Sequence, residues 1–191
     1  QTFYGSYPWS ALILTQSNGY IGIGVLIDHM HVLTVAHRIS SYASNPFALK
    51  VRMGEWNIGS TTQPIPPREF NVIRIFMHPQ FNSQTLVNGI AIMRLSPNVP
   101  LGVAPTLGTA CLSSAQITGA RCWVAGWGQN SFTNGSIQSI QTHVDVPLID
   151  QVTCQNQLRA TRLGGGFILD TFSFLCAGGI SGRDACVGKE E

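Results

Sequence analysis

Short runs of apolar, β-forming residues recur along the chain, and clusters of Gly, Pro, Asn and Ser separate them. The runs predict strands over residues 11–15, 20–27, 31–37, 49–56, 70–77, 90–95, 121–128, 140–149 and 172–179. Short strands at this spacing, with turn residues between them, are typical of an antiparallel sandwich or barrel. The pattern therefore predicts an all-β fold.

One segment departs from the strand pattern. Asp150 is a residue type that often caps helix N-termini, and residues 151–163 after it carry good helix formers and end at glycines 164–166. We therefore predict one short helix over about 151–163. Residues 96–114 contain few β-forming runs and predict a long connector between two β-rich parts.

The composition indicates a globular protein with an uncharged polar surface. Of the 191 residues, 44% are hydrophobic, which is enough for a sizeable core, and only 10% are charged. Ordinary domains carry about 25% charged residues. A surface made mostly of Ser, Thr, Asn and Gln is commoner in extracellular β-proteins than in cytosolic enzymes.

Charge and hydropathy exclude two classes of partner. The net charge is +2 and the basic residues are scattered singly, so no patch could neutralise successive phosphates of a nucleic acid. The longest apolar runs, at 11–14 and 21–27, are far shorter than the roughly 20 residues that cross a bilayer. We expect no nucleic acid and no membrane. The chain starts at Gln1 without a leader, so we expect any signal peptide to be upstream or removed.

Two longer motifs carry a resemblance to a known family. Residues 24–37 read GVLIDHMHVLTVAH, and residues 122–128 read CWVAGWG. Further matches in the same order are YPW at 7–9, GEWN at 54–57, HPQFN at 78–82, NGIAIMRL at 88–95 and CAGG at 176–179. The chain resembles the trypsin and chymotrypsin family of serine proteases. Within it, the chain is most similar to the arthropod clip-domain serine protease homologues, a subgroup with non-catalytic members.

The resemblance implies a trypsin-like double antiparallel β-barrel. The first barrel would occupy about residues 1–110, and a partial, truncated second barrel about residues 111–191. The whole chain would then be one incomplete trypsin-like peptidase domain. By the same resemblance we expect a clip domain upstream of this chain.

The resemblance also assigns the catalytic triad, of which only the histidine is present. His37 matches the family's histidine, whereas Gly89 occupies the aspartate position and Glu190 the position of the nucleophilic serine. Asn88 could orient the imidazole but supplies no charge. Loss of the carboxylate lowers turnover of the triad by about 10⁴, and no serine of this chain lies in a G-x-S-x-G elbow. We therefore predict that His37 is vestigial.

The five cysteines leave an odd number in the chain, which in a secreted protein implies an outside partner or a free thiol. The resemblance implies a disulfide between Cys154 and Cys176. It also implies that the partners of Cys111, Cys122 and Cys186 lie outside this chain.

Further candidate sites rest on single positions. The resemblance puts Asp184 at the bottom of a substrate pocket, where it would pair with an Arg or Lys of the substrate. Glu55 matches one ligand of the calcium loop found in some trypsin-like proteins, and Glu69 could be another. We favour a solvated loop over a calcium site there and expect no cofactor. Asn134 begins a glycosylation sequon. No C-x-x-C or H-E-x-x-H occurs, so we expect no zinc site.

Taken together, these features predict a secreted, extracellular, non-catalytic serine protease homologue that acts as a cofactor or regulator of an extracellular protease cascade. The resemblance implies a role in innate immunity and melanisation, with prophenoloxidase or a clip-domain protease as the partner. The alternative is an active trypsin-like serine endopeptidase whose C-terminal part with the nucleophile is missing from this chain. A third possibility is a non-functional splice or pseudogene product.

Overall fold

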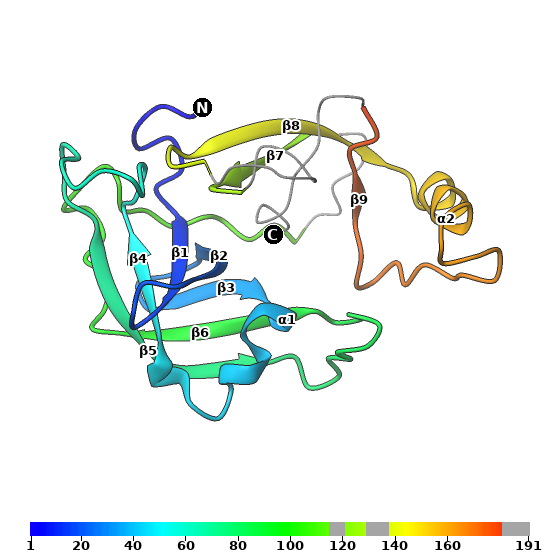
Figure 1. Cartoon of the computed structure of the whole chain (residues 1–191), viewed down its shortest axis with the longest axis horizontal. Coiled ribbons are helices and arrows are strands. Elements are labelled where there is room, and N and C mark those ends of the chain that lie inside the picture. Colours follow the sequence, from blue (N-terminus) through cyan, green and yellow to red (C-terminus); the bar gives the residue numbers. More distant parts are fainter. Residues whose placement is uncertain (115–120, 129–137, 181–191) are drawn as a thin grey trace.

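The computed structural model describes residues 1–114, 121–128 and 138–180. Figure 1 shows a closed barrel of strands below and a smaller three-stranded sheet above it. The helices among the described residues are short, and none is long and apolar enough to span a bilayer. The predicted all-β class is confirmed.

The barrel is built from the strands of the first β-rich part. They are β1 (Ser10–Thr15), β2 (Tyr20–Leu26), β3 (His31–Val35), β4 (Leu49–Met53), β5 (Arg68–Met77) and β6 (Ile90–Ser96). They close in the order β1-β2-β3-β6-β5-β4, and every neighbouring pair is antiparallel. Closure pairs both edges of every strand, so the barrel has no open sheet edge.

Alternation along each strand separates the barrel core from its surface, as β6 illustrates. Ala91, Met93 and Leu95 are buried in the core, whereas Ile90 and Arg94 are exposed on the outer face. Successive side chains of a strand point to opposite faces, so the hydrophobic pattern of the sequence fixes which residues fill the barrel.

The second sheet consists of β7 (Arg121–Gly126), β8 (Thr142–Ile149) and β9 (Cys176–Ala177), in the order β7-β8-β9. The strand predicted over 172–179 is wrong for most of its length. The Asp170 carboxylate accepts hydrogen bonds from the N–H groups of Phe172 (3.0 Å) and Ser173 (3.1 Å). This side-chain turn bends the backbone, and extended pairing begins only at Cys176.

Four other strands end earlier than predicted: β2 by one residue, β7 by two, and β3 and β4 for the reasons given next. β4 stops at Met53 because Gly54 adopts a φ of 73°, which breaks the extended conformation. The run 31–37 was expected to be one strand, but β3 ends at Val35 and the next residues form α1 (Ala36–Ile39). Ala36 and Ile39 are buried, so this turn of helix is held by the barrel core rather than by its own length. Short 3₁₀ turns follow at Ser40–Tyr42 and Pro46–Ala48.

The predicted helix forms as α2 (Gln151–Arg159), and Asp150 caps it by accepting a hydrogen bond from the Thr153 N–H at 2.9 Å. It ends before residue 163. The Ala160 N–H donates to the Gln157 carbonyl at 3.1 Å, and Thr161 repeats the pattern with Leu158. These tighter bonds end the α-helix several residues before the glycines.

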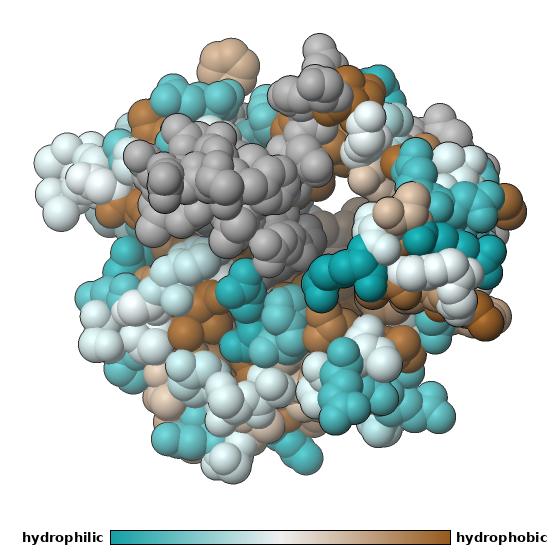
Figure 2. All heavy atoms as spheres, turned by 45° about the vertical axis from the view of Figure 1, so that its right-hand side comes forward, coloured by the Kyte–Doolittle hydropathy of each residue, from teal (hydrophilic) through white to brown (hydrophobic). Residues whose placement is uncertain are grey.

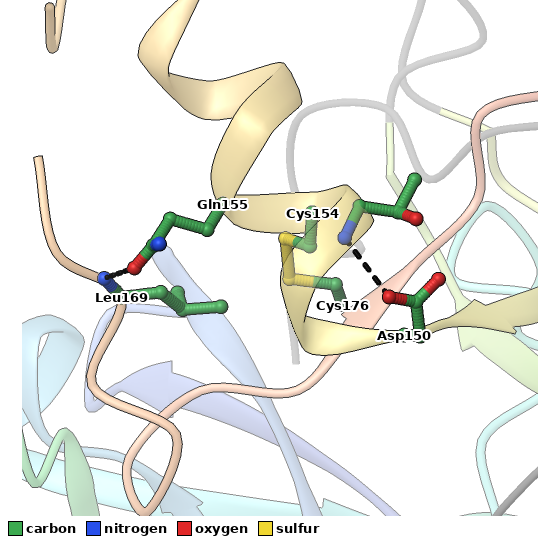
Figure 3. Close-up of a disulfide and its surroundings, with 6 residues drawn as sticks. Asp150, Cys154, Gln155, Leu169 and Cys176 are labelled. Carbon is green, nitrogen blue, oxygen red and sulfur yellow. Dashed lines mark hydrogen bonds between the residues drawn. A yellow bond between two sulfur atoms is a disulfide. The ribbon is translucent and has the colours of Figure 1, made fainter. Parts of the chain in front are cut away.

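A disulfide joins α2 to the second sheet (Figure 3). It links Cys154 with Cys176, the pair that the resemblance implied. On the same helix, the Gln155 side chain accepts a hydrogen bond from the N–H of Leu169, a buried residue of the following loop. The disulfide and this bond fasten the loop after α2 at two points.

An apolar contact connects the second β-rich part to the outside of the barrel. Trp127, which follows β7 and is 1% exposed, packs with Leu12, Leu14 and Ile23 on the outer face of β1 and β2. Its indole N–H donates to the Trp56 carbonyl at 3.0 Å, so the large ring is buried with its polar group satisfied.

A buried polar contact forms the second connection. Gln141, 3% exposed, accepts a hydrogen bond from the Thr2 hydroxyl at 3.1 Å and donates to the Ser10 hydroxyl at 3.1 Å. Its backbone N–H donates to the Trp56 carbonyl at 2.8 Å, and its carbonyl accepts from the Thr2 N–H at 2.9 Å. One residue therefore ties the N-terminal segment, the barrel and the second sheet together.

We predict that Gln141→Leu lowers the free energy of unfolding by about 2 kcal/mol, because the Thr2 and Ser10 hydroxyls would lose a buried partner. Urea denaturation of both proteins measures the difference. Gln157→Leu on the exposed side of α2 is the matched control and should change stability little. Equal stability of Gln141→Leu and the wild type would contradict the assignment of Gln141 as the link between the parts.

Candidate functional site

A cleft of about 1030 Å³ lies between the barrel and the second sheet. The barrel contributes residues of β2, β3 and β6, and the second part contributes residues of β7 and of the segment 172–174. The space-filling view shows an opening in this face of the molecule, with apolar and polar residues intermixed along its coloured side (Figure 2). A cleft of this size and mixed lining is the candidate binding site of the molecule.

The cleft brings together two of the three positions assigned from the sequence. His37 follows β3 in α1 and is exposed, and Gly89 immediately precedes β6. The Gly89 carbonyl accepts a hydrogen bond from the N–H of Ala36 at 2.8 Å, and both His37 and Gly89 line the cleft. Glu190, at the third position, lies outside the described residues, as do Asp184, Asn134 and Cys186.

The turn before Gly89 is shaped around the absence of a side chain. A β-carbon added to Gly89 would lie 2.8 Å from the Leu86 carbonyl oxygen, closer than real contacts allow. Leu86 and Asn88 both have positive φ values, 60° and 56°, which non-glycine residues adopt at a cost. The backbone therefore closes tightly over Gly89, and a larger residue there requires the turn to move.

The Asn88 side chain, considered as a group that could orient the His37 imidazole, instead contacts Gln80 and Ser173. Its side-chain amide donates to the Gln80 carbonyl at 3.1 Å, and its backbone N–H donates to the Ser173 hydroxyl oxygen at 3.0 Å. The Ser173 hydroxyl in turn donates to the Asn88 side-chain oxygen at 3.4 Å. Both polar ends of the amide are engaged in these contacts, so Asn88 joins the barrel to the loop after α2 across the cleft.

An aromatic cluster, which the sequence did not predict, forms another wall of the cleft. Tyr7, Trp9 and Trp123 line it, and Trp123 is 56% exposed. The Tyr7 hydroxyl lies 2.7 Å from His143 Nδ1, and the rings of Trp123 and His143 are 4.5 Å apart. Burial raises the pKa of Tyr7 above its ordinary value. In the sequence, the motifs YPW and CWVAGWG indicate only the family. Neither motif contains a local signal that its aromatic side chains contact those of the other.

The loop considered as a possible calcium site contains an arginine that pairs with both of its acidic residues. The carboxylate of Glu55 is buried and accepts hydrogen bonds from the Trp56 N–H at 3.0 Å and from the Gln63 side chain. Arg52 lies between the two acidic residues, with Nη1 at 3.5 Å from Glu55 and Nη2 at 2.7 Å from Glu69. A guanidinium in this position does not fit a calcium ion bound by the same carboxylates, so calcium at Glu55 stays a prediction that these contacts disfavour.

The charges around Glu69 favour its ionised form. Burial opposes ionisation, but hydrogen bonds from Arg52 and Lys50, the latter at 3.0 Å, outweigh it and hold the pKa of Glu69 below its ordinary value.

Within the described ranges, no group of three His, Cys, Asp or Glu side chains could hold a metal ion. In the same ranges Cys111 is an exposed thiol and Cys122 a half-buried one.

Comparison with known proteins identifies relatives over almost the whole chain. The sequence model of one family, described as Trypsin, matches residues 1–189. The chain is 50% identical over 188 residues to Inactive CLIP domain-containing serine protease A3 of Aedes aegypti, which covers 98% of this chain and 40% of that protein.

Two further relatives are more distant. Phenoloxidase-activating factor 2 of Galleria mellonella is 38% identical over 201 residues, or 97% of this chain and 64% of that protein. Inactive CLIP domain-containing serine protease A28 of Anopheles gambiae is 31% identical over 193 residues, or 97% of this chain and 49% of that protein. The chain spans less than two thirds of the length of each of these relatives.

We predict that Gly89→Ala lowers the free energy of unfolding by about 2 kcal/mol, because the new β-carbon would displace the Leu86 carbonyl. Gly165→Ala is the control, since a β-carbon at Gly165 meets no atom within 4 Å. Thermal unfolding of both variants checks this. Equal melting temperatures for the two variants would show that the turn yields without cost.

We predict that Arg52→Gln lowers the free energy of unfolding by about 2 kcal/mol, because the buried Glu55 carboxylate would lose its cation. Arg68→Gln, an exposed arginine at the start of β5, is the control. Calcium and a chelator should leave the melting temperature of the wild type unchanged.

The effect of Arg52→Gln depends on pH. Because the folded-state pKa of Glu69 is depressed, its contribution is complete above the unfolded-state pKa and is lost as pH falls through the folded-state pKa. The stability difference between Arg52→Gln and wild type should therefore shrink in acid. A difference that grows as pH falls would contradict the assigned pairing.

Proposed function

Because this chain belongs to the trypsin family, we propose that it is a non-catalytic member that acts by binding other proteins of a protease cascade. The observation that carries this proposal is the turn at Gly89. It puts a residue without a side chain beside His37, in a backbone that leaves no room for a carboxylate. The relatives whose names describe them as inactive support the same reading.

The chemistry of the site explains the expected loss of activity. A histidine acts as a general base on a serine when a carboxylate fixes its tautomer and stabilises the imidazolium that forms. With Gly89 in the aspartate position, His37 has no such group there. Loss of the carboxylate costs about 10⁴ in turnover, equivalent to about 5 kcal/mol in activation free energy.

The barrel is intact although the assigned triad is defective. His37 is exposed, and Gly89 lies at the end of a strand, so neither contributes to the buried core. Loss of catalytic side chains therefore leaves the scaffold and its outer surfaces in place. A binding function for these surfaces is consistent with a protein that keeps the fold but lacks the chemistry.

The cascade is the finer part of the proposal. One relative is named Phenoloxidase-activating factor 2, and others are named as CLIP domain-containing serine proteases. These names support the finer proposal that the chain acts in a secreted, extracellular cascade of innate immunity and melanisation, with prophenoloxidase or a clip-domain protease as the bound protein. The protein would act there as a cofactor or regulator.

We predict that the purified protein does not hydrolyse arginyl esters or arginyl peptide substrates above the buffer rate. His37→Ala should leave this background rate unchanged, because Gly89 supplies no carboxylate at the aspartate position of the triad. Gly89→Asp should also remain at background, since the turn does not accommodate the side chain. Trypsin assayed under the same conditions is the positive control. Hydrolysis by the wild type that His37→Ala abolishes would overturn the proposal in favour of an active endopeptidase.

A further inference from the structure

A row of basic side chains crosses the outer face of the barrel. Arg94 on β6 lies directly opposite Arg74 on β5 and directly opposite His31 on β3. Figure 1 shows β3, β6 and β5 side by side in this order. Arg74 and Arg94 are exposed, and their strand neighbours Ile75, Met93 and Leu95 face the core. The three basic groups therefore lie next to one another on the surface.

Arg74 and Arg94 face each other across two neighbouring strands. Within residues 1–114, 121–128 and 138–180, neither guanidinium forms an ion pair with a carboxylate, whereas Lys50 and Arg52 on the same barrel do. Asp28, in the connection between β2 and β3, lies 2.8 Å from His31 and also accepts hydrogen bonds from the backbone N–H groups of Met30 and His31. Like charges directly opposite on neighbouring strands destabilise a sheet. An anion bound between the arginines would remove this repulsion.

An apolar row lies beside the basic one. Ile92 pairs with Phe76 on β5 and with Leu33 on β3, each two residues from the basic row along its strand. Phe76 is 39% exposed, and the Arg74 guanidinium lies 4.7 Å from the centre of its ring. Contact with the ring face positions the guanidinium by a cation–π interaction. The surface thus offers an anchored cation pair next to exposed apolar side chains.

We propose that the face formed by His31, Arg74, Phe76, Ile92 and Arg94 binds an acidic, apolar segment of a partner protein. A carboxylate of the segment lies between Arg74 and Arg94, where two guanidiniums can each donate paired hydrogen bonds to its oxygens. An apolar side chain next to that carboxylate packs on Phe76 and Ile92. The proposal rests on the proposed binding function and names the surface and the chemistry of the partner.

The apolar row favours a peptide over a sulfated polysaccharide. A sulfated polysaccharide carries charge along its whole length and needs an extended basic surface. On this face there is one pair of arginines, and the neighbouring cross-strand pair is apolar, Ile92 and Phe76. Arg68, the other exposed arginine of β5, lies at the opposite end of that strand and pairs with Met53 of β4. It is therefore a matched control that carries the same charge outside the proposed surface.

Fluorescence anisotropy with a labelled peptide of alternating Asp and Leu residues tests the proposal on the whole chain. We expect binding that weakens about tenfold in Arg74→Gln and in Arg94→Gln, because each variant removes one charge-assisted contact. Arg68→Gln should bind as the wild type does. A peptide of alternating Asn and Leu should bind at least tenfold more weakly than the acidic one.

Stability measurements separate loss of binding from loss of folding. Arg94→Glu would face Arg74 with an opposite charge, so we expect a melting temperature above that of the wild type together with loss of peptide binding. The proposal is overturned if Arg68→Gln weakens binding as much as Arg94→Gln, if the Asn peptide binds equally well, or if a heparin fragment binds and the acidic peptide does not. Hydrolysis of substrate by the wild type would refute the proposed function without changing these binding results.

Discussion

The buried amide of Gln141 fixes how the two β-rich parts of this chain meet, and the candidate site depends on that arrangement. Its side chain bonds to Thr2 and Ser10, and its backbone bonds to the Trp56 loop. Beside it, Trp127 fills the apolar contact on the outside of the barrel. Because buried polar groups are costly unless satisfied, these bonds permit essentially one relation between the parts. The cleft, and the approach of Trp123 and Ser173 to the His37 side of the barrel, follow from it.

The barrel and the site obey different constraints. The barrel is closed, its core is filled by alternating residues, and no strand edge is left open. The turn at Gly89 lies outside that core, at the point where β6 begins. A protein of this construction can lose the groups of a catalytic centre and keep its stability, since the two reside in different parts of the molecule.

The charged side chains on two sides of the barrel are arranged differently. Arg52 and Lys50 pair with Glu69, and Arg52 also reaches Glu55, so this side of the barrel uses internal cations to hold an acidic loop. On the β3-β6-β5 side the paired residues are Arg74 and Arg94, and the described part of the chain provides no carboxylate between them. The first arrangement contributes to folding. The second costs stability and is explained by a ligand.

The sequence by itself determined the class of fold, most strand positions, the cap of α2 at Asp150 and the family, because alternation, capping residues and motifs are local signals. It misplaced the ends of β3, β4 and α2, and most of the strand predicted over 172–179, where a buried contact, a positive φ or a side-chain turn competes with local preference. It assigned Gly89 to the position of the missing aspartate, but it did not indicate that the backbone turn there leaves no room for a side chain. Only the tertiary structure joined Tyr7 to His143, Asn88 to Ser173 and Arg74 to Arg94, since strand register and packing between distant segments decide which side chains meet.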